Sequence, residues 1–166
     1  MKKITKSKIN LFVKGALTLL LIFPLFLKPL QAFAEIAETE LNGEMLNAST
    51  EFLRDLDYET WQLVAYKSPD SQDELILRII GYPGSLRIDH PLSLNVESGR
   101  KEWQLSDKTL QNETLVNDSR QAAAEFDLKA LISDLSQNRP LRLSLPGVFS
   151  ELPVPPFLVK EWRSIN

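Results

Sequence analysis

The sequence contains no cysteine and a single histidine, His90. Without cysteine, the fold depends on a packed core and not on disulfide bonds, and an N-terminus anchored through a lipid-modified cysteine is excluded. Zinc and copper sites need nitrogen or sulfur ligands, and one histidine is too few for either metal. We therefore expect no metal site and no cofactor.

Glycine is also scarce, and the glycines after residue 34 are scattered: Gly43, Gly81, Gly84, Gly99 and Gly147. A loop that cradles phosphate needs clustered glycines before a helix, so nucleotide binding by that route is excluded. The acidic stretch at residues 70–74 superficially resembles a calcium loop. It lacks the ligand spacing and the central glycine of such a loop, so a solvated acidic turn is favoured.

Acidic residues are absent from the first 34 positions. This segment has five lysines up to Lys14, an apolar stretch at residues 16–27 and small residues at Ala32 and Ala34. The three parts together are typical of a secretory signal peptide. We expect residues 1–34 to be this signal, with cleavage after Ala34.

The competing interpretation of the same segment is an uncleaved membrane anchor. A helix that spans the bilayer needs roughly 20 consecutive apolar residues, whereas Pro24, Lys28 and Pro29 interrupt this run. Cleavage is therefore favoured, and contact with the membrane is expected only during export.

The rest of the chain carries all 22 acidic residues but only 13 of the 19 basic ones, which gives a formal charge of −9. This charge argues against binding to nucleic acid or to anionic lipid surfaces. Residues 35–44 are acidic and lack periodicity, so we expect a flexible leader there. Residues 45–166 have the length of a single domain.

The strongest helical signal lies between Asp127 and Gln137. Four large aliphatic residues are spaced to lie on one face of a helix: Leu128, Leu131, Ile132 and Leu135. Asp127 is expected to cap the first turn, and Pro140 prevents the helix from continuing. The apolar face of this helix must pack against another element, most simply a β-sheet.

Much of the remaining chain reads as short strands. The expected strands are 46–53, 60–67, 74–82, 86–89, 92–96, 102–105, 141–145 and 157–162, with weaker signals at 115–116 and 122–126. The prolines at residues 153–156 indicate a segment at a sheet edge. The fold class is α+β, mainly antiparallel β: a single sheet-dominated domain, either a curled sheet around the helix or a sandwich.

His90 is the one candidate for a general base of the usual kind. A hydrolase would pair it with a serine such as Ser85 or Ser93 and with a carboxylate such as Asp89. Neighbours on a strand point to opposite faces, so Asp89 cannot orient His90 there. The favoured role is structural, with the ring bonded to backbone before Pro91, and no catalytic residue is assigned.

Two further groups of side chains have both a chemical and a structural interpretation. Asp55 and Asp57 are able to act as acid and base on a glycan, but among so many acidic residues a pair is expected by chance. Trp61, Trp103 and Trp162 are suited to a ligand pocket. In a small sheet domain tryptophans more often belong to the core or its rim.

Several short motifs follow one another along the chain: Leu53-Arg54-Asp55, Trp61-Gln62, Leu77-Arg78, Gly81-Tyr82-Pro83-Gly84, His90-Pro91, Phe126-Asp127-Leu128, Val154-Pro155-Pro156 and Glu161-Trp162. In this order they resemble an exported cyanobacterial family classed as a domain of unknown function, from about residue 44 to residue 162. The resemblance implies the periplasm or the thylakoid lumen, with the extracellular space as the alternative, and it implies no activity. The positions to probe first are Arg54, Asp55, Gly84, His90 and Trp162.

These features favour a non-catalytic exported binding or accessory domain that engages an envelope or lumenal protein through an edge strand or a loop rim. The missing catalytic constellation and the prolines near the C-terminus motivate this prediction. Two alternatives stay open. One is a hydrolase using His90 with nearby acids, and the other is a small-molecule carrier with an enclosed interior.

Overall fold

The computed structural model describes residues 36–41, 44–69, 71, 73–82, 87–118 and 122–165, all within one compact unit at residues 33–166. The predictions for the signal segment and for Gly84 lie outside the described residues, as does part of the acidic stretch at 70–74. The elements are β1 (Ile36–Leu41), β2 (Glu44–Arg54), β3 (Thr60–Lys67), β4 (Leu75–Ile80), β5 (Leu94–Ser98), β6 (Lys101–Leu105), the 3₁₀ turn η2 (Thr109–Gln111), α2 (Glu113–Val116), β7 (Ala123–Asp127), α3 (Lys129–Asp134), β8 (Leu141–Leu145), β9 (Phe149–Val154) and α4 (Pro156–Trp162).

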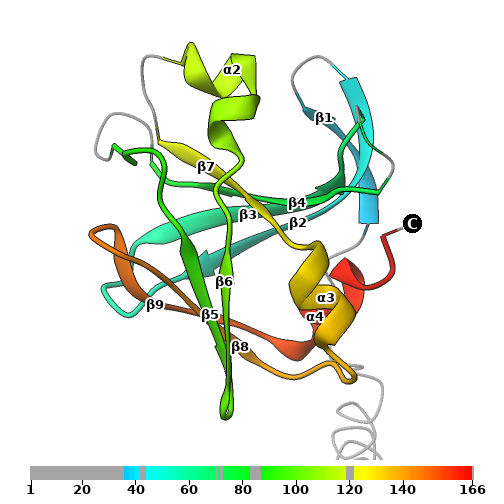
Figure 1. Cartoon of the computed structure of the whole chain (residues 1–166), viewed down its shortest axis with the longest axis vertical. Helices are drawn as coiled ribbons and strands as arrows, with labels where there is room; N and C mark the ends of the chain where they lie inside the picture. The colour runs from blue at the N-terminus through cyan, green and yellow to red at the C-terminus, as the bar shows by residue number, and fades with distance from the viewer. Residues whose placement is uncertain are drawn as a thin grey trace, which may run out of the picture. The chain divides into compact units, whose positions relative to one another are not determined.

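The strands form two antiparallel sheets (Figure 1). One sheet has the order β1-β2-β3-β4-β7 and the other has the order β6-β5-β8-β9. The predicted α+β class dominated by antiparallel sheet is confirmed. Within the described residues no helix has the length and apolarity that crossing a bilayer requires.

The two sheets share one hydrophobic core, to which each contributes one face of its strands. Along β3 the side chains of Trp61, Leu63 and Ala65 enter this core, as the alternation of a strand requires. Leu141, Leu143 and Leu145 of β8 enter it from the second sheet. Both strands have the bounds that the sequence predicts, Thr60–Lys67 and Leu141–Leu145.

The other face of the five-stranded sheet is buried in its central part. A second apolar cluster lies there, formed by Ala48, Val64, Tyr66 and Ile76. Arg78 of β4 and Glu125 of β7 lie opposite each other in the register and are 5% and 4% exposed. Burial on both faces explains why every residue of β4 except Arg78 is apolar.

Helix α3 is shorter than predicted. It spans only six residues, and Leu135 already has extended dihedral angles. Asp127 ends β7 and Leu128 is the N-cap, but the Asp127 side chain still accepts a hydrogen bond from the Lys129 amide at 2.9 Å. The predicted apolar face is buried at Leu128, Leu131 and Leu135. The face was predicted correctly, whereas the length was not.

Four other predictions of secondary structure were wrong. The expected flexible leader contains β1, which pairs with β2 from Ile36 to Leu41. Residues 157–162 belong to α4, which begins at Pro156, where a missing amide costs nothing. Residues 87–89 form no strand, and residues 115–116 belong to α2 because Asn112 caps a helical turn there. The proline-containing strand β9 does lie at a sheet edge, as expected.

Candidate functional site

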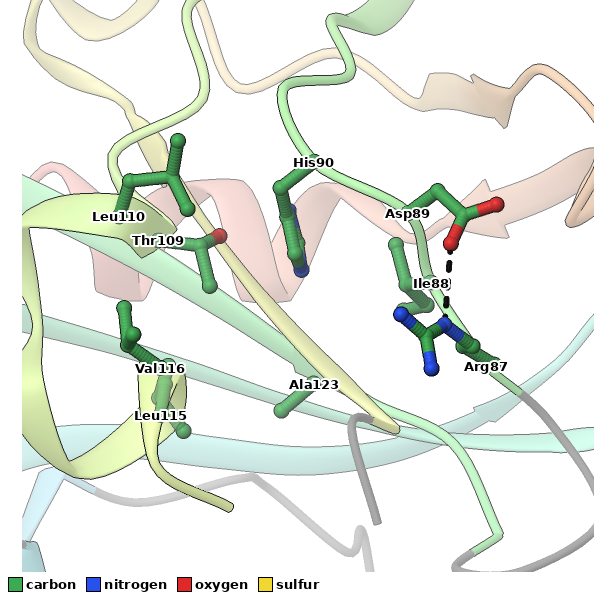
Figure 2. Close-up of a pocket in the computed structure, with 9 residues that line it drawn as sticks. All are labelled: Arg87, Ile88, Asp89, His90, Thr109, Leu110, Leu115, Val116 and Ala123. Atoms are coloured by element: carbon green, nitrogen blue, oxygen red, sulfur yellow. Dashed lines mark hydrogen bonds and ion pairs between the residues drawn. The ribbon is translucent and has the colours of Figure 1, made fainter. Parts of the chain in front are cut away.

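A cavity of about 370 Å³ lies between the segment before β5, the η2–α2 segment and the start of β7 (Figure 2). Its volume is in the range of small-ligand sites. Nine described residues line it: Arg87, Ile88, Asp89, His90, Thr109, Leu110, Leu115, Val116 and Ala123.

Most of the lining is apolar. Ile88 is buried, whereas Leu110 and Val116 are 61% and 45% exposed. Among the polar groups, Arg87 and Asp89 bond to each other at 3.0 Å, and both are largely exposed to solvent. Figure 2 shows the His90 ring between Thr109 and Ile88, with Ala123 and Leu115 below it in this view. His90 thus shares the cavity lining with five apolar residues and with Arg87, Asp89 and Thr109.

His90 is held by Asp107, a residue 17 positions further along the chain. The Nδ1 atom of His90 lies 2.7 Å from Oδ2 of Asp107, and the two side chains are 12% and 4% exposed. The same Oδ2 accepts from the Leu92 amide at 2.8 Å, and Oδ1 accepts from the Thr109 amide at 2.8 Å. The expected bonds from the ring to backbone are replaced by this carboxylate, because a loop before η2 brings Asp107 beside the ring.

The electrostatics of Asp107 favour its ionised form. Burial raises the pKa of this carboxyl group, but hydrogen bonds from the Thr109 side chain, from His90 and from the amides of Leu92 and Thr109 outweigh burial and hold the pKa below the usual aspartate range. The carboxylate is thus an acceptor at both oxygens and orients the imidazole.

Asp107→Asn is expected to lower the free energy of unfolding by about 1–3 kcal/mol at neutral pH, because buried donors lose a charged acceptor. The pKa of Asp107 is lower in the folded chain, so its contribution is complete above the unfolded value and is lost as the pH falls through the folded one. The gap between wild type and variant should close below about pH 4. Urea denaturation at several pH values measures this difference in the free energy of unfolding. A difference that does not depend on pH contradicts the role assigned to the ionised Asp107 carboxylate.

A buried polar network fixes the wall of the cavity that η2 and α2 form. Glu125 accepts from Arg78 Nε at 2.7 Å, from the Tyr66 hydroxyl, and from Asn112 Nδ2 at 3.1 Å. Asn112 in turn caps α2, since its Oδ1 accepts from the Thr114 and Leu115 amides. The Glu125 amide donates to Thr109 Oγ1 at 2.9 Å. The network thus ties the cavity wall to the sheet.

Tyr66 is the neutral member of this network. Burial, followed by the nearby Glu125 carboxylate, raises the pKa of the Tyr66 hydroxyl well above its usual value. The guanidinium of Arg78 lies 5.5 Å from the centre of the Tyr66 ring. The Tyr66 hydroxyl therefore stays protonated and donates a hydrogen bond to the Glu125 carboxylate.

The positions singled out from the sequence do not form one site. Arg54 is exposed at the end of β2. Asp55 is buried in the β2–β3 turn, where it accepts from two backbone amides and from Trp61 Nε1 at 2.8 Å. Trp162 is fully buried in the core. No hydrogen bond or ion pair within the described part of the chain joins Asp55, His90 and Trp162, and of these three His90 alone lines the cavity.

The other sequence interpretations can now be compared with the structure. Trp61 and Trp162 are core residues, and Trp103 packs at the edge of the core, with its Nε1 donating to Asp134 at 3.0 Å. Asp55 organises a turn, because its Oδ1 accepts from the Asp57 amide and its Oδ2 from Trp61 Nε1. The core interpretation of the tryptophans therefore holds.

Sequence reasoning missed Asp107 and the Arg78–Glu125 pair. Asp107 lies outside the strands that the sequence predicts, and no local pattern links it to His90. Arg78 did leave a signal, because a charged residue within the most apolar strand of the chain requires a buried partner. Glu125, the one charged residue of strand β7 before its terminal Asp127, was the matching signal.

The family model described as "Protein of unknown function (DUF3122)" matches residues 34–165. The chain belongs to this family. The match includes the cavity, the buried network and both sheets, and it confirms the predicted resemblance to a domain of unknown function. No match to a curated protein or to a solved structure was found. Membership of the DUF3122 family brings no activity with it, so function must be argued from the site itself.

Proposed function

We propose that the chain is an exported, soluble, non-catalytic binding domain that holds a small, largely apolar molecule in the cavity at His90. The observation that supports this proposal is the His90–Asp107 pair at a mainly apolar cavity of ligand size. The proposal combines the binding role that the sequence favours with the alternative of a small-molecule carrier. The buried network beneath η2 and α2 gives the cavity a fixed wall, and a preformed site reduces the cost of ordering on binding.

Native mass spectrometry of the protein isolated from its source cells is expected to show a bound small molecule. Ala123→Phe, which places a ring in the cavity, should lose this extra mass while the chain stays folded. Leu56→Phe alters an exposed residue outside the cavity lining and should keep it. A chain that carries no extra mass, or an adduct that survives Ala123→Phe, contradicts the proposal.

Export to the periplasm or the thylakoid lumen is part of the proposal, with the extracellular space as the alternative. It is supported by the signal-like pattern of residues 1–34. The processed protein should begin at Glu35, which N-terminal sequencing of the native protein tests. A chain that retains the preceding residues contradicts cleavage.

An envelope or lumenal protein is the proposed partner that delivers or receives the ligand. Leu110 and Val116 line the cavity and are exposed, so the rim of the cavity is the surface we assign to that contact. Pull-down from an osmotic-shock or lumen fraction should recover the partner with wild type and lose it with Leu110→Asp.

A hydrolase using His90 is the second candidate. It is favoured by the carboxylate that orients the imidazole, although the partner is Asp107 and not Asp89, which bonds to Arg87. Thr109 lines the same cavity, but its hydroxyl accepts from the Glu125 amide and the residue is 2% exposed. Turnover of esters or glycans that is lost in His90→Ala would establish this candidate, whereas equal turnover or none removes it.

A further inference from the structure

The hydrogen bonds of Asp107 determine which ring nitrogen of His90 carries the proton. Both carboxylate oxygens accept from backbone amides, from Leu92 at Oδ2 and from Thr109 at Oδ1. An oxygen that accepts from an amide and lies 2.7 Å from Nδ1 is an acceptor for the ring as well. In neutral His90 the proton is therefore on Nδ1, and Nε2 carries a lone pair.

Nε2 has no hydrogen-bond partner among the described residues. His90 lines the cavity together with Ile88, Leu115 and Val116. The single uncommitted ring atom at this site is thus a hydrogen-bond acceptor placed among apolar side chains.

We infer that the cavity takes a neutral molecule with a hydroxyl group on an apolar body, a phenol or an alcohol, whose hydroxyl donates to Nε2 of His90. This inference rests on the proposed function and specifies its ligand. An acceptor on the protein calls for a donor on the ligand. A charge taken from water must be paired, and the two charged residues that line the cavity, Arg87 and Asp89, are bonded to each other, so a neutral ligand is favoured.

The first measurement determines the tautomer. Because the chain has a single histidine, a long-range ¹H–¹⁵N spectrum of the full chain labelled at histidine contains only His90 signals. Recorded at alkaline pH, where the His90 signals no longer change with pH, the spectrum should show protonated Nδ1 and unprotonated Nε2. A proton on Nε2 overturns the inference.

The second measurement compares two probes that differ only in the donor. By titration calorimetry, 4-propylphenol should bind about tenfold more tightly than 4-propylanisole, which corresponds to one hydrogen bond. His90→Phe keeps a ring but removes the acceptor, so it should bring the affinity for the phenol down to that for the anisole. Thermal unfolding of the variant verifies that it is folded.

The outcomes separate the inference from the proposed function. Equal affinities for the two probes overturn the ligand class but leave a binding cavity. Discrimination that persists in His90→Phe also overturns it, because the donor would then be recognised elsewhere. If neither probe binds and the native protein carries no small molecule, the proposed function fails together with the inference.

Discussion

Glu125→Ala is expected to lower the free energy of unfolding by about 3–5 kcal/mol, the usual cost of removing one partner from a buried ion pair. Arg78 Nη2 lies 2.6 Å from Glu125 Oε1, and both side chains are almost completely buried. The substitution takes away the carboxylate that this charge contacts, and it also takes the acceptor from Tyr66 and Asn112. Urea denaturation followed by circular dichroism measures the loss.

Glu97→Ala is the matched control for this prediction. Glu97 pairs with Arg142 at 3.0 Å, but both side chains are about half exposed, so its removal should cost at most about 1 kcal/mol. Equal losses in the two variants would show that burial of the Arg78–Glu125 pair does not have the energetic role assigned to it. Glu125→Ala should also weaken ligand binding, because the hydrogen bonds from the Asn112 side chain to this carboxylate are lost.

Trp162→Ala is expected to cost about 3–5 kcal/mol, as large core truncations do. Trp162 is fully buried on α4 beside Leu158 and Val159 in the common core. Its Nε1 has no hydrogen-bond partner among the described residues. Trp162→Phe therefore breaks no hydrogen bond and keeps an aromatic ring in the core, so it should lower the free energy of unfolding clearly less than Trp162→Ala does. Thermal and urea unfolding compare the two.

The result that contradicts this structural role is specific. If Trp162→Ala leaves stability within about 1 kcal/mol of wild type, the side chain is not part of the core as described. If it leaves stability unchanged but abolishes ligand binding, Trp162 has a role at a site that its place in the core does not explain.

Alternation of apolar and polar residues was enough to predict β8. The strict pattern of Leu141–Leu145 gives this strand its correct bounds, since a period of two residues has no helical counterpart. Strand β3 was also predicted with its correct bounds, although both of its faces carry apolar residues, which belong to two separate clusters. Strand β1 could not be found this way, because Ile36–Leu41 has no apolar periodicity of its own and is ordered by pairing with β2. Tertiary pairing overrides weak local preference in such segments.

The final segment was misread for a different reason. The pattern of residues 157–162 predicts a strand after the prolines, whereas Pro156 occupies the first turn of α4. Leu158, Val159 and Trp162 then fall on one buried face of that helix. The signal was present in the sequence, since proline is favoured at the start of a helix as well as at a sheet edge.

The candidate site was only half visible in the sequence. His90 was conspicuous as the single histidine, but its orientation depends on Asp107, which reaches it through the loop between β6 and η2. The cavity itself depends on how η2 and α2 lie against β7, which the buried network of Glu125 and Asn112 determines. Contacts between such distant segments are not encoded in any local pattern.

The most direct test of the binding role is a methyl ¹H–¹³C spectrum of the full chain titrated with 4-propylphenol. The account predicts that saturable shifts concentrate on the methyl groups of Ile88, Leu110, Leu115 and Val116, which line the cavity, while the methyl groups of Leu143 and Leu152 in the common core stay unchanged. Shifts that spare the cavity methyl groups, or that spread evenly over the core, would contradict it.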